Sequence, residues 1–235
     1  MDRRHFMQLC ATGYAIANAG QLAAQDAGPM RVKEYARAQL VDEIGTPIRA
    51  SHLIADRAYI FHYPFAGTPC FLLNLGRPVQ PADGLRTSDD RQYRWNGGVG
   101  QHRAVVAYSA ICAHRMTYPT RDISFIGYRD QPTQHGKAPK VIHCCSEHSQ
   151  FDPAAGARVV AGPAPQPLAA IALDYDRDSD GVFAVGTQGG ELFDAFFAKY
   201  EFKLTLEHGG KARSAIAQST VVRELTQYCK QPVKC

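Results

Sequence analysis

The sequence predicts a mainly β protein, built as one domain with an appended C-terminal segment. Short apolar and aromatic runs recur along the middle of the chain and are bounded by Gly, Pro, Asn or Asp, a pattern typical of strands and turns. Helical spacing of apolar residues stands out only near the C-terminus. The sequence has no internal repeat, so a repeat architecture is excluded.

The first expected strands form a hairpin. Residues 58–64 and 70–76 are apolar runs, and the Phe-Ala-Gly-Thr-Pro segment between them favours a turn. Residues 76–103 are polar with several Gly and Pro, which predicts a long loop. The other expected strands are 104–111, 140–144, 157–162, 168–173, 181–186 and, last, 202–207.

Two helices are expected. A short one is predicted near residues 32–40, in a mixed polar region. The second covers residues 191–200, where Leu192, Phe193, Phe196 and Phe197 would share one face. Such a stripe is more typical of core packing than of a docking face.

Composition limits the classes of partner. The chain has 235 residues, of which 45% are hydrophobic and 20% charged, an ordinary globular balance. Its net charge of +4 is modest and no Lys/Arg block is present, so no nucleic-acid partner is expected. Seven cysteines are an odd number, so at least one lies outside any internal disulfide.

The N-terminus resembles a twin-arginine signal. Arg3 and Arg4 precede Phe6 and a mildly apolar run from Leu9 to Ala24, which is short of the ~20 residues that span a bilayer. Residues 1–27 are therefore expected to direct export to the periplasm, and the signal is either cleaved or kept as an anchor. The alternative is a basic N-terminus followed by an apolar helix.

Two short motifs place Cys and His together at strand ends. Cys112-Ala-His114 follows one expected strand, and Cys145-Ser-Glu-His148 follows another. Four such ligands suit tetrahedral zinc, and they equally suit a [2Fe–2S] cluster held by two Cys and two His. Zinc fingers usually pair Cys with Cys and His with His, whereas each motif here mixes the two, which favours the cluster.

A proline-rich segment follows the second motif, Gly162-Pro163-Ala164-Pro165. Prolines fix φ and stiffen a loop that would lie over the cluster. With both motifs, this segment resembles Rieske iron–sulfur proteins of the respiratory type. "FHYPFAGTPCFLLNLG", "GGVGQHRAVVAYSAICAH" and "FAVGTQGG" are most similar to the arsenite oxidase small subunits.

The resemblance implies a Rieske-type antiparallel β-sandwich over residues 28–190, with a small cluster-binding subdomain whose loops lie in 109–168. Residues 191–235 would be a C-terminal extension. One Rieske-type [2Fe–2S] cluster per chain is implied, with one iron bound by Cys112 and Cys145 and the other by His114 and His148.

The sequence also departs from this family. Thr117 and Glu147 stand where respiratory Rieske proteins often have a disulfide between the two loops, and Phe151 stands about where they have a tyrosine. Ser149 remains a possible hydrogen-bond donor to the cluster. Fewer donors and a nearby carboxylate disfavour the reduced cluster, so a potential in the middle or lower Rieske range is expected, within about −150 to +300 mV.

The function implied by the resemblance is single-electron transfer by an exported protein. It would be the small iron–sulfur subunit of a periplasmic oxidoreductase or respiratory complex and no catalyst on its own. Its redox partner would be a molybdenum subunit, a cytochrome b or a cytochrome c, with membrane contact only through an uncleaved signal or that partner. A structural Cys2His2 zinc module is the alternative. An oxygenase component is disfavoured, because it needs a non-haem iron site on a further large domain.

The remaining cysteines and nearby histidines are given structural roles. Cys144 has C-x3-H spacing to His148, which is the wrong spacing for the motif, and is interpreted as a strand-end residue that is either buried or bonded to another Cys. Cys70 is interpreted as a buried free thiol. Cys229 and Cys235 are close enough in sequence to form a small disulfide, which is left open. The other histidines near the second motif, His135 and His143, are expected to be structural rather than ligands.

Overall fold

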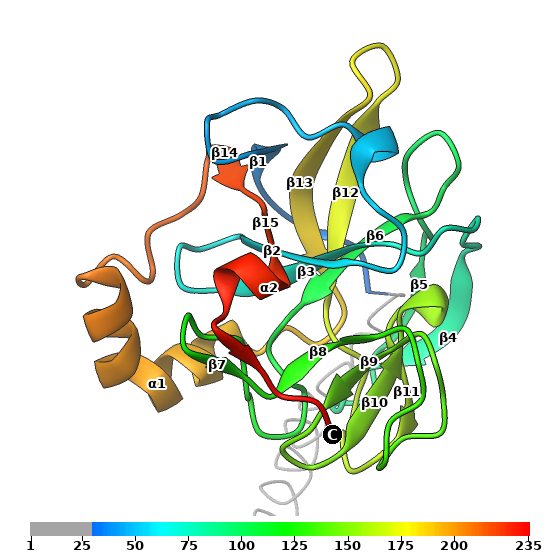
Figure 1. Ribbon diagram of the computed structural model, residues 1–235, viewed down its shortest axis with the longest axis vertical. Coiled ribbons are helices and arrows are strands. Elements are labelled where there is room, and N and C mark those ends of the chain that lie inside the picture. Colours follow the sequence, from blue (N-terminus) through cyan, green and yellow to red (C-terminus); the bar gives the residue numbers. More distant parts are fainter. Residues whose placement is uncertain (1–29) are drawn as a thin grey trace, which may run out of the picture.

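The protein is seen here as a computed structural model that describes residues 30–235, and it confirms the mainly β prediction (Figure 1). The strands are β1 Lys33–Val41, β2 Ala58–His62, β3 Pro69–Asn74, β4 Ala82–Arg86, β5 Gln92–Trp95, β6 Val105–Ser109, β7 Ile123–Ser124, β8 Ile126–Arg129, β9 Val141–Cys144, β10 Ser149–Asp152, β11 Arg158–Ala161, β12 Ala170–Asp176, β13 Gly181–Gln188, β14 Gln218–Val221, β15 Arg223–Glu224 and β16 Gln231–Pro232. The helices are α1 Phe193–His208 and α2 Leu225–Tyr228.

These strands form one large and one small sheet, with two short ribbons. The large sheet has eight strands in the order β14-β1-β13-β12-β6-β3-β2-β15, and the small one has four in the order β11-β10-β9-β8. The ribbons are β4-β5 and β16-β7. Most pairs are antiparallel, but β14 joins β1 and β16 joins β7 in parallel. The predicted hairpin is present as β2–β3.

The core lies on both faces of the large sheet. On β3, Phe71 and Leu73 belong to an apolar cluster shared with Ile142 and Phe151 of the small sheet. The alternate residues of β3 point to the opposite face, where Leu72 packs in a second cluster. A strand buried on both faces is apolar at every position, which is why this stretch is a continuous hydrophobic run.

Three local predictions are wrong. Of the helix predicted near residues 32–40, residues 33–40 lie in β1, which pairs with β13 and β14, and no helix is present there. The predicted loop 76–103 contains the β4–β5 hairpin. The predicted strand 202–207 continues α1: its apolar alternation is real, but only Leu204 is buried while Phe202 and Leu206 are exposed.

The predicted apolar face at residues 191–200 is present in α1. Phe193, Phe196 and Phe197 are buried in one cluster with Ile111 and Tyr118, so this face is core. α1 ends at Gly209, whose φ of 57° is the left-handed conformation that glycine adopts at helix ends without steric cost.

The C-terminal segment completes the domain. β14 and β15 extend the two edges of the large sheet, and β16 pairs with β7 (Figure 1). The boundaries predicted at residues 28–190 and 191–235 stay predictions. The predicted signal segment, residues 1–27, lies outside the described residues. Within residues 30–235, no helix combines the length and apolar character needed to cross a bilayer.

His62 of β2 ties this segment to the sheet and provides a pH test. Its ring lies 5.9 Å from that of His208 and 5.8 Å from that of Tyr228, centroid to centroid. Burial, and then the nearby His208, Arg121 and Arg223, lower the pKa of His62 from 6.5 to about 3. Below pH 6.5, His62 therefore becomes protonated in the unfolded chain, whereas in the folded protein it stays neutral down to about pH 3.

We expect the free energy of unfolding to fall as the pH is lowered through this range, by up to about 1.4 kcal/mol per pH unit from His62 alone. Urea denaturation at several pH values measures the slope. A His62→Gln variant should show a shallower slope than the wild type. Equal slopes in the two proteins would contradict a neutral, buried His62.

Candidate metal centre

The first Cys/His loop follows β6 and is a tight turn. The Cys112 N–H donates to the Thr117 carbonyl at 2.8 Å, and the Met116 N–H donates back to the Cys112 carbonyl at 2.8 Å. Met116 adopts a φ of 60°, in the left-handed region that closes such a turn. The Cys112 side chain is thereby directed inward and is only 1% exposed.

Helix α1 supports this first loop. The Tyr118 ring packs edge-on against Phe196, with centroids 4.9 Å apart. Lys199 Nζ donates to the carbonyl oxygen of Arg115 at 2.7 Å. The first loop is therefore held from the core side by β6 and from the outside by α1.

The second loop joins β9 to β10 as a hairpin. Cys144 pairs with Ser149 across the ladder, which leaves residues 145–148 as the connecting loop. His148, the last residue of this loop, has a φ of 58°, a conformation in which His is found more often than most residues. The loop thus places His148 one residue from the strand pair that Cys144 closes.

The structure brings the Cys112 and Cys144 thiols together. Both residues lie in one apolar cluster and are 1% exposed, and each thiol shifts the pKa of the other. Nearby backbone N–H groups favour the thiolate form of each, those of His114 and Arg115 for Cys112, and those of Ser146 and Glu147 for Cys144.

The two thiols differ in acidity. The interaction with Cys112 is the largest effect on Cys144 and lowers its pKa to about 7. Backbone N–H groups and the Thr117 hydroxyl also lower this pKa, whereas burial raises it. The same interaction and burial raise the pKa of Cys112. Thiolates are the form of cysteine that binds metals, and donors aimed at the sulfur are what stabilise them.

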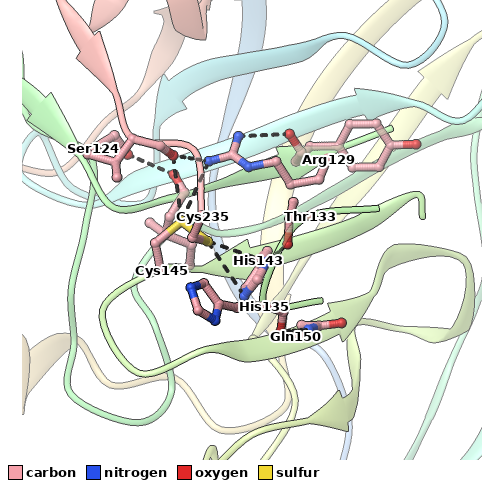
Figure 2. Close-up of a disulfide and its surroundings, with 11 residues drawn as sticks. Ser124, Arg129, Thr133, His135, His143, Cys145, Gln150 and Cys235 are labelled. Carbon is pink, nitrogen blue, oxygen red and sulfur yellow. Dashed lines mark hydrogen bonds between the residues drawn. A yellow bond between two sulfur atoms is a disulfide. The ribbon is translucent and has the colours of Figure 1, made fainter. Parts of the chain in front are cut away.

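Cys145 is the cysteine that the sequence predicted as the ligand in the second loop. Its sulfur forms a disulfide with Cys235, the last residue of the chain (Figure 2). The physical reason is strand alternation: Ile142 and Cys144 share the core face of β9, whereas Cys145 has entered the turn. The suggested Cys229–Cys235 disulfide is wrong, because Cys229 is a free, buried thiol. Cys70 is a free, buried thiol as expected.

The two predicted histidines each have a buried ring nitrogen available. Nδ1 of His114 and Nδ1 of His148 are buried and have no hydrogen-bond partner among the described residues. The hydroxyl oxygen of Ser149 is also buried and has no hydrogen-bond partner among the described residues. Only five side-chain atoms in residues 30–235 are buried and unpaired in this way; two of them belong to the motifs and a third to the residue that follows the second motif. Buried polar groups are almost always paired, so this concentration fits a site that binds a metal group.

The second loop also contacts histidines that sequence reasoning assigned to structural roles. The His148 ring lies 4.5 Å from that of His135 and 5.8 Å from that of His143, centroid to centroid. Ring nitrogens of His143 and His148 and the sulfur of Cys235 lie within 4.8 Å of one another. Since Cys235 is disulfide-bonded, this group offers a metal only two imidazoles while that bond is intact. No motif spacing could have revealed the group of His143, His148 and Cys235, because Cys235 is far from the two histidines in sequence.

The proline segment packs on the second loop, as the sequence suggested. Gly162 has a φ of +85°, and a Cβ built on it would lie 2.5 Å from the Ser149 Cα and 2.6 Å from the His148 carbonyl oxygen. Only glycine allows this approach of two backbones. The start of the segment, Gly162, therefore lies directly against the backbone of His148 and Ser149.

One ion pair connects the two loops at the surface. Arg115 Nε of the first loop lies 3.3 Å from Glu147 Oε1 of the second. Both side chains are well exposed, so the pair adds little stability but places one charge of each sign beside the site.

No known family profile matches the chain. One similar solved structure is the soluble domain of the Rieske protein II (soxF) from Sulfolobus acidocaldarius. The two are 26% identical in sequence and superpose with a TM-score of 0.45, over 67% of this chain and 82% of that chain.

Replacing Gly162 by alanine should disturb the second loop. We expect Gly162→Ala to lower the free energy of unfolding by more than about 2 kcal/mol, because both the positive φ and a backbone clash must be relieved. Gly45→Ala is the matched control: Gly45 has the same φ of +85°, but a Cβ there meets nothing within 4 Å. It should cost only about 1 kcal/mol. Equal losses of stability in the two variants, measured by urea denaturation, would contradict the tight contact.

Proposed function

We propose that this protein is an electron-transfer protein carrying a Rieske-type [2Fe–2S] cluster. The observation that carries the proposal is the meeting of two buried thiols from two loops, each of which also presents a histidine with an unpaired Nδ1. Mixed cysteine and histidine ligation is the defining donor set of a Rieske cluster.

The residues present fit such a group. Two neighbouring thiols can give two thiolates when metal binds, with the release of both thiol protons. The unpaired Nδ1 atoms of His114 and His148 and the unpaired Ser149 hydroxyl are the polar atoms that a bound cluster would satisfy. Cys112, His114, His148 and one cysteine of the second loop would hold it.

A bound cluster of this kind takes up and releases one electron. The chain's contribution is to hold and insulate it. Backbone N–H groups of the two loops stabilise the sulfur charge, and the apolar cluster around Cys112 and Cys144 keeps water from the sulfurs. His114 and His148 are partly exposed, so this side of the site is the one a redox partner would approach.

The wider setting is also a proposal. The twin-arginine motif at Arg3 and Arg4 supports periplasmic export of a folded, cofactor-loaded protein. A disulfide between Cys145 and Cys235 suits such an oxidising compartment. We propose that the protein is the small iron–sulfur subunit of a periplasmic oxidoreductase or respiratory complex, similar to the arsenite oxidase small subunit. It would exchange single electrons with a molybdenum subunit, a cytochrome b or a cytochrome c and be no catalyst by itself.

The structural zinc module is the less favoured alternative. Structural zinc sites usually pair Cys with Cys in one motif and His with His in another, whereas each loop here carries one of each. The close group of His143, His148 and Cys235 loses its only sulfur to the Cys145–Cys235 disulfide. Zinc bound in place of iron would nevertheless be the outcome that overturns the electron-transfer proposal.

Metal analysis and electron paramagnetic resonance test the proposal directly. Purified protein should contain about two iron atoms and two acid-labile sulfides per chain, and after reduction it should show a rhombic signal of low average g value. His148→Ala should abolish the signal by removing one ligand. His102→Ala, which changes an exposed histidine outside the motifs, should leave it intact. A protein that contains zinc and gives no signal would refute the proposal.

The surface ion pair predicts opposite shifts of the midpoint potential. Reduction adds negative charge to the site, so Glu147→Gln should raise the potential and Arg115→Gln should lower it. Each shift should be on the order of 20 mV at low ionic strength and smaller in high salt. Asp174→Asn removes an exposed carboxylate on β12 and is the control. Redox titration measures all four proteins, and shifts of the same sign in the two loop variants would contradict this electrostatic effect.

A further inference from the structure

We infer that the second loop binds the cluster through Cys144 and not through Cys145, whose sulfur instead anchors the C-terminus of the chain to the same loop. The inference rests on the proposed function and deepens it. It departs from the C-x-x-H spacing of the second motif and assigns a C-x3-H pair, Cys144 and His148, as the ligands of that loop.

The first argument is placement. Cys144 ends β9 on the face that packs into the core, in the same apolar cluster as Ile142 and Cys112. Cys144 and Cys112 are both 1% exposed, and each thiol shifts the pKa of the other, so the thiols of the two loops are buried side by side. A shift of one residue along the chain turns a side chain to the opposite side of a strand. Cys145 therefore cannot replace Cys144 without breaking the β9–β10 pairing.

The second argument is the arrangement of donors around Cys144. The N–H groups of Ser146 and Glu147 and the hydroxyl of Thr117 lie close enough to the Cys144 sulfur to favour its thiolate form. Thr117 belongs to the first loop, so donors from both loops converge on this atom. Such an arrangement is what a metal-bound thiolate requires of its surroundings.

The third argument is the reach of the hairpin. Cys144 and Ser149 face each other across the ladder, so their Cα atoms are about 5 Å apart. His148 directly precedes Ser149 and is turned by its left-handed backbone. The three intervening residues form the outside of the loop, which lets a C-x3-H pair converge on one site.

The fourth argument is that Cys145 already has a partner. The chain from Lys230 to Val233 runs along residues 121–124, with backbone hydrogen bonds of 2.8 to 3.0 Å, before it reaches Cys235. Arg129 donates to the Val233 carbonyl oxygen, and its NH2 group lies 3.9 Å from the Cys145 sulfur. Figure 2 shows Arg129 on one side of the disulfide and His135 and His143 on the other. These hydrogen bonds hold residues 230–233 in place, so that Cys235 lies within bonding distance of Cys145.

The test compares two adjacent cysteines in the cluster-loaded protein. Cys144→Ser should lose the rhombic signal and nearly all iron and acid-labile sulfide. Cys145→Ser and Cys235→Ser should keep about two iron atoms per chain, because they remove only the disulfide. Loss of the cluster in Cys145→Ser with its retention in Cys144→Ser would overturn the inference.

A measurement on the wild type keeps the inference testable if a variant fails to fold. Iron-loaded protein is alkylated without reductant, digested and analysed by mass spectrometry. A Cys145–Cys235 disulfide in at least nine-tenths of the iron-loaded chains supports the inference, since a disulfide sulfur is no thiolate ligand. Iron-loaded chains in which Cys145 and Cys235 are free thiols overturn it. Wild-type protein that binds no iron would instead refute the proposed function, so the two failures are distinct.

Discussion

The burial of Cys112 and Cys144 in one apolar cluster is the constraint around which the rest of the site is arranged. A buried thiolate is costly unless donors lie near it, and backbone N–H groups of both loops favour the thiolate form of these sulfurs. Those donors exist only because both loops adopt tight turns with left-handed residues, Met116 in one and His148 in the other. The local backbone conformation and the chemistry of the site are therefore inseparable.

The two loops are positioned by opposite ends of the C-terminal segment. Its first part, α1, packs Phe196 against Tyr118 and so supports the first loop. Its last residue, Cys235, is bonded to Cys145 and so holds the second. Between these points, β14 and β15 pair with edges of the large sheet. A segment that the sequence marked only as an extension is thus part of the support of both loops.

The apolar core connects the site to the whole domain. Cys112 and Cys144 lie in the same cluster as Phe71 and Leu73 of the large sheet and Phe151 of the small one. Interiors are packed closely, so a change in this cluster is felt at the sulfurs. Phe151 is fully buried there, which explains why an apolar ring suits this position.

The sequence by itself determined the mainly β fold, the β2–β3 hairpin, the buried face at the start of α1 and the two short motifs that bring Cys and His together. These features depend on residues close in the chain, whose spacing and turn chemistry are visible locally. It misassigned residues 202–207, because alternation of Phe202, Leu204 and Leu206 does not reveal which of them the fold buries.

Only the tertiary structure decided that Cys144, and not the adjacent Cys145, lies in the same apolar cluster as Cys112. Spacing to His148 favoured Cys145, but the direction of a side chain at a strand end depends on how β9 pairs with β10. The partner of Cys145 lies 90 residues away, and its approach depends on the pairing of β16 with β7. Such long-range pairing is set by the packing of the whole chain, and no local pattern of residues contains it.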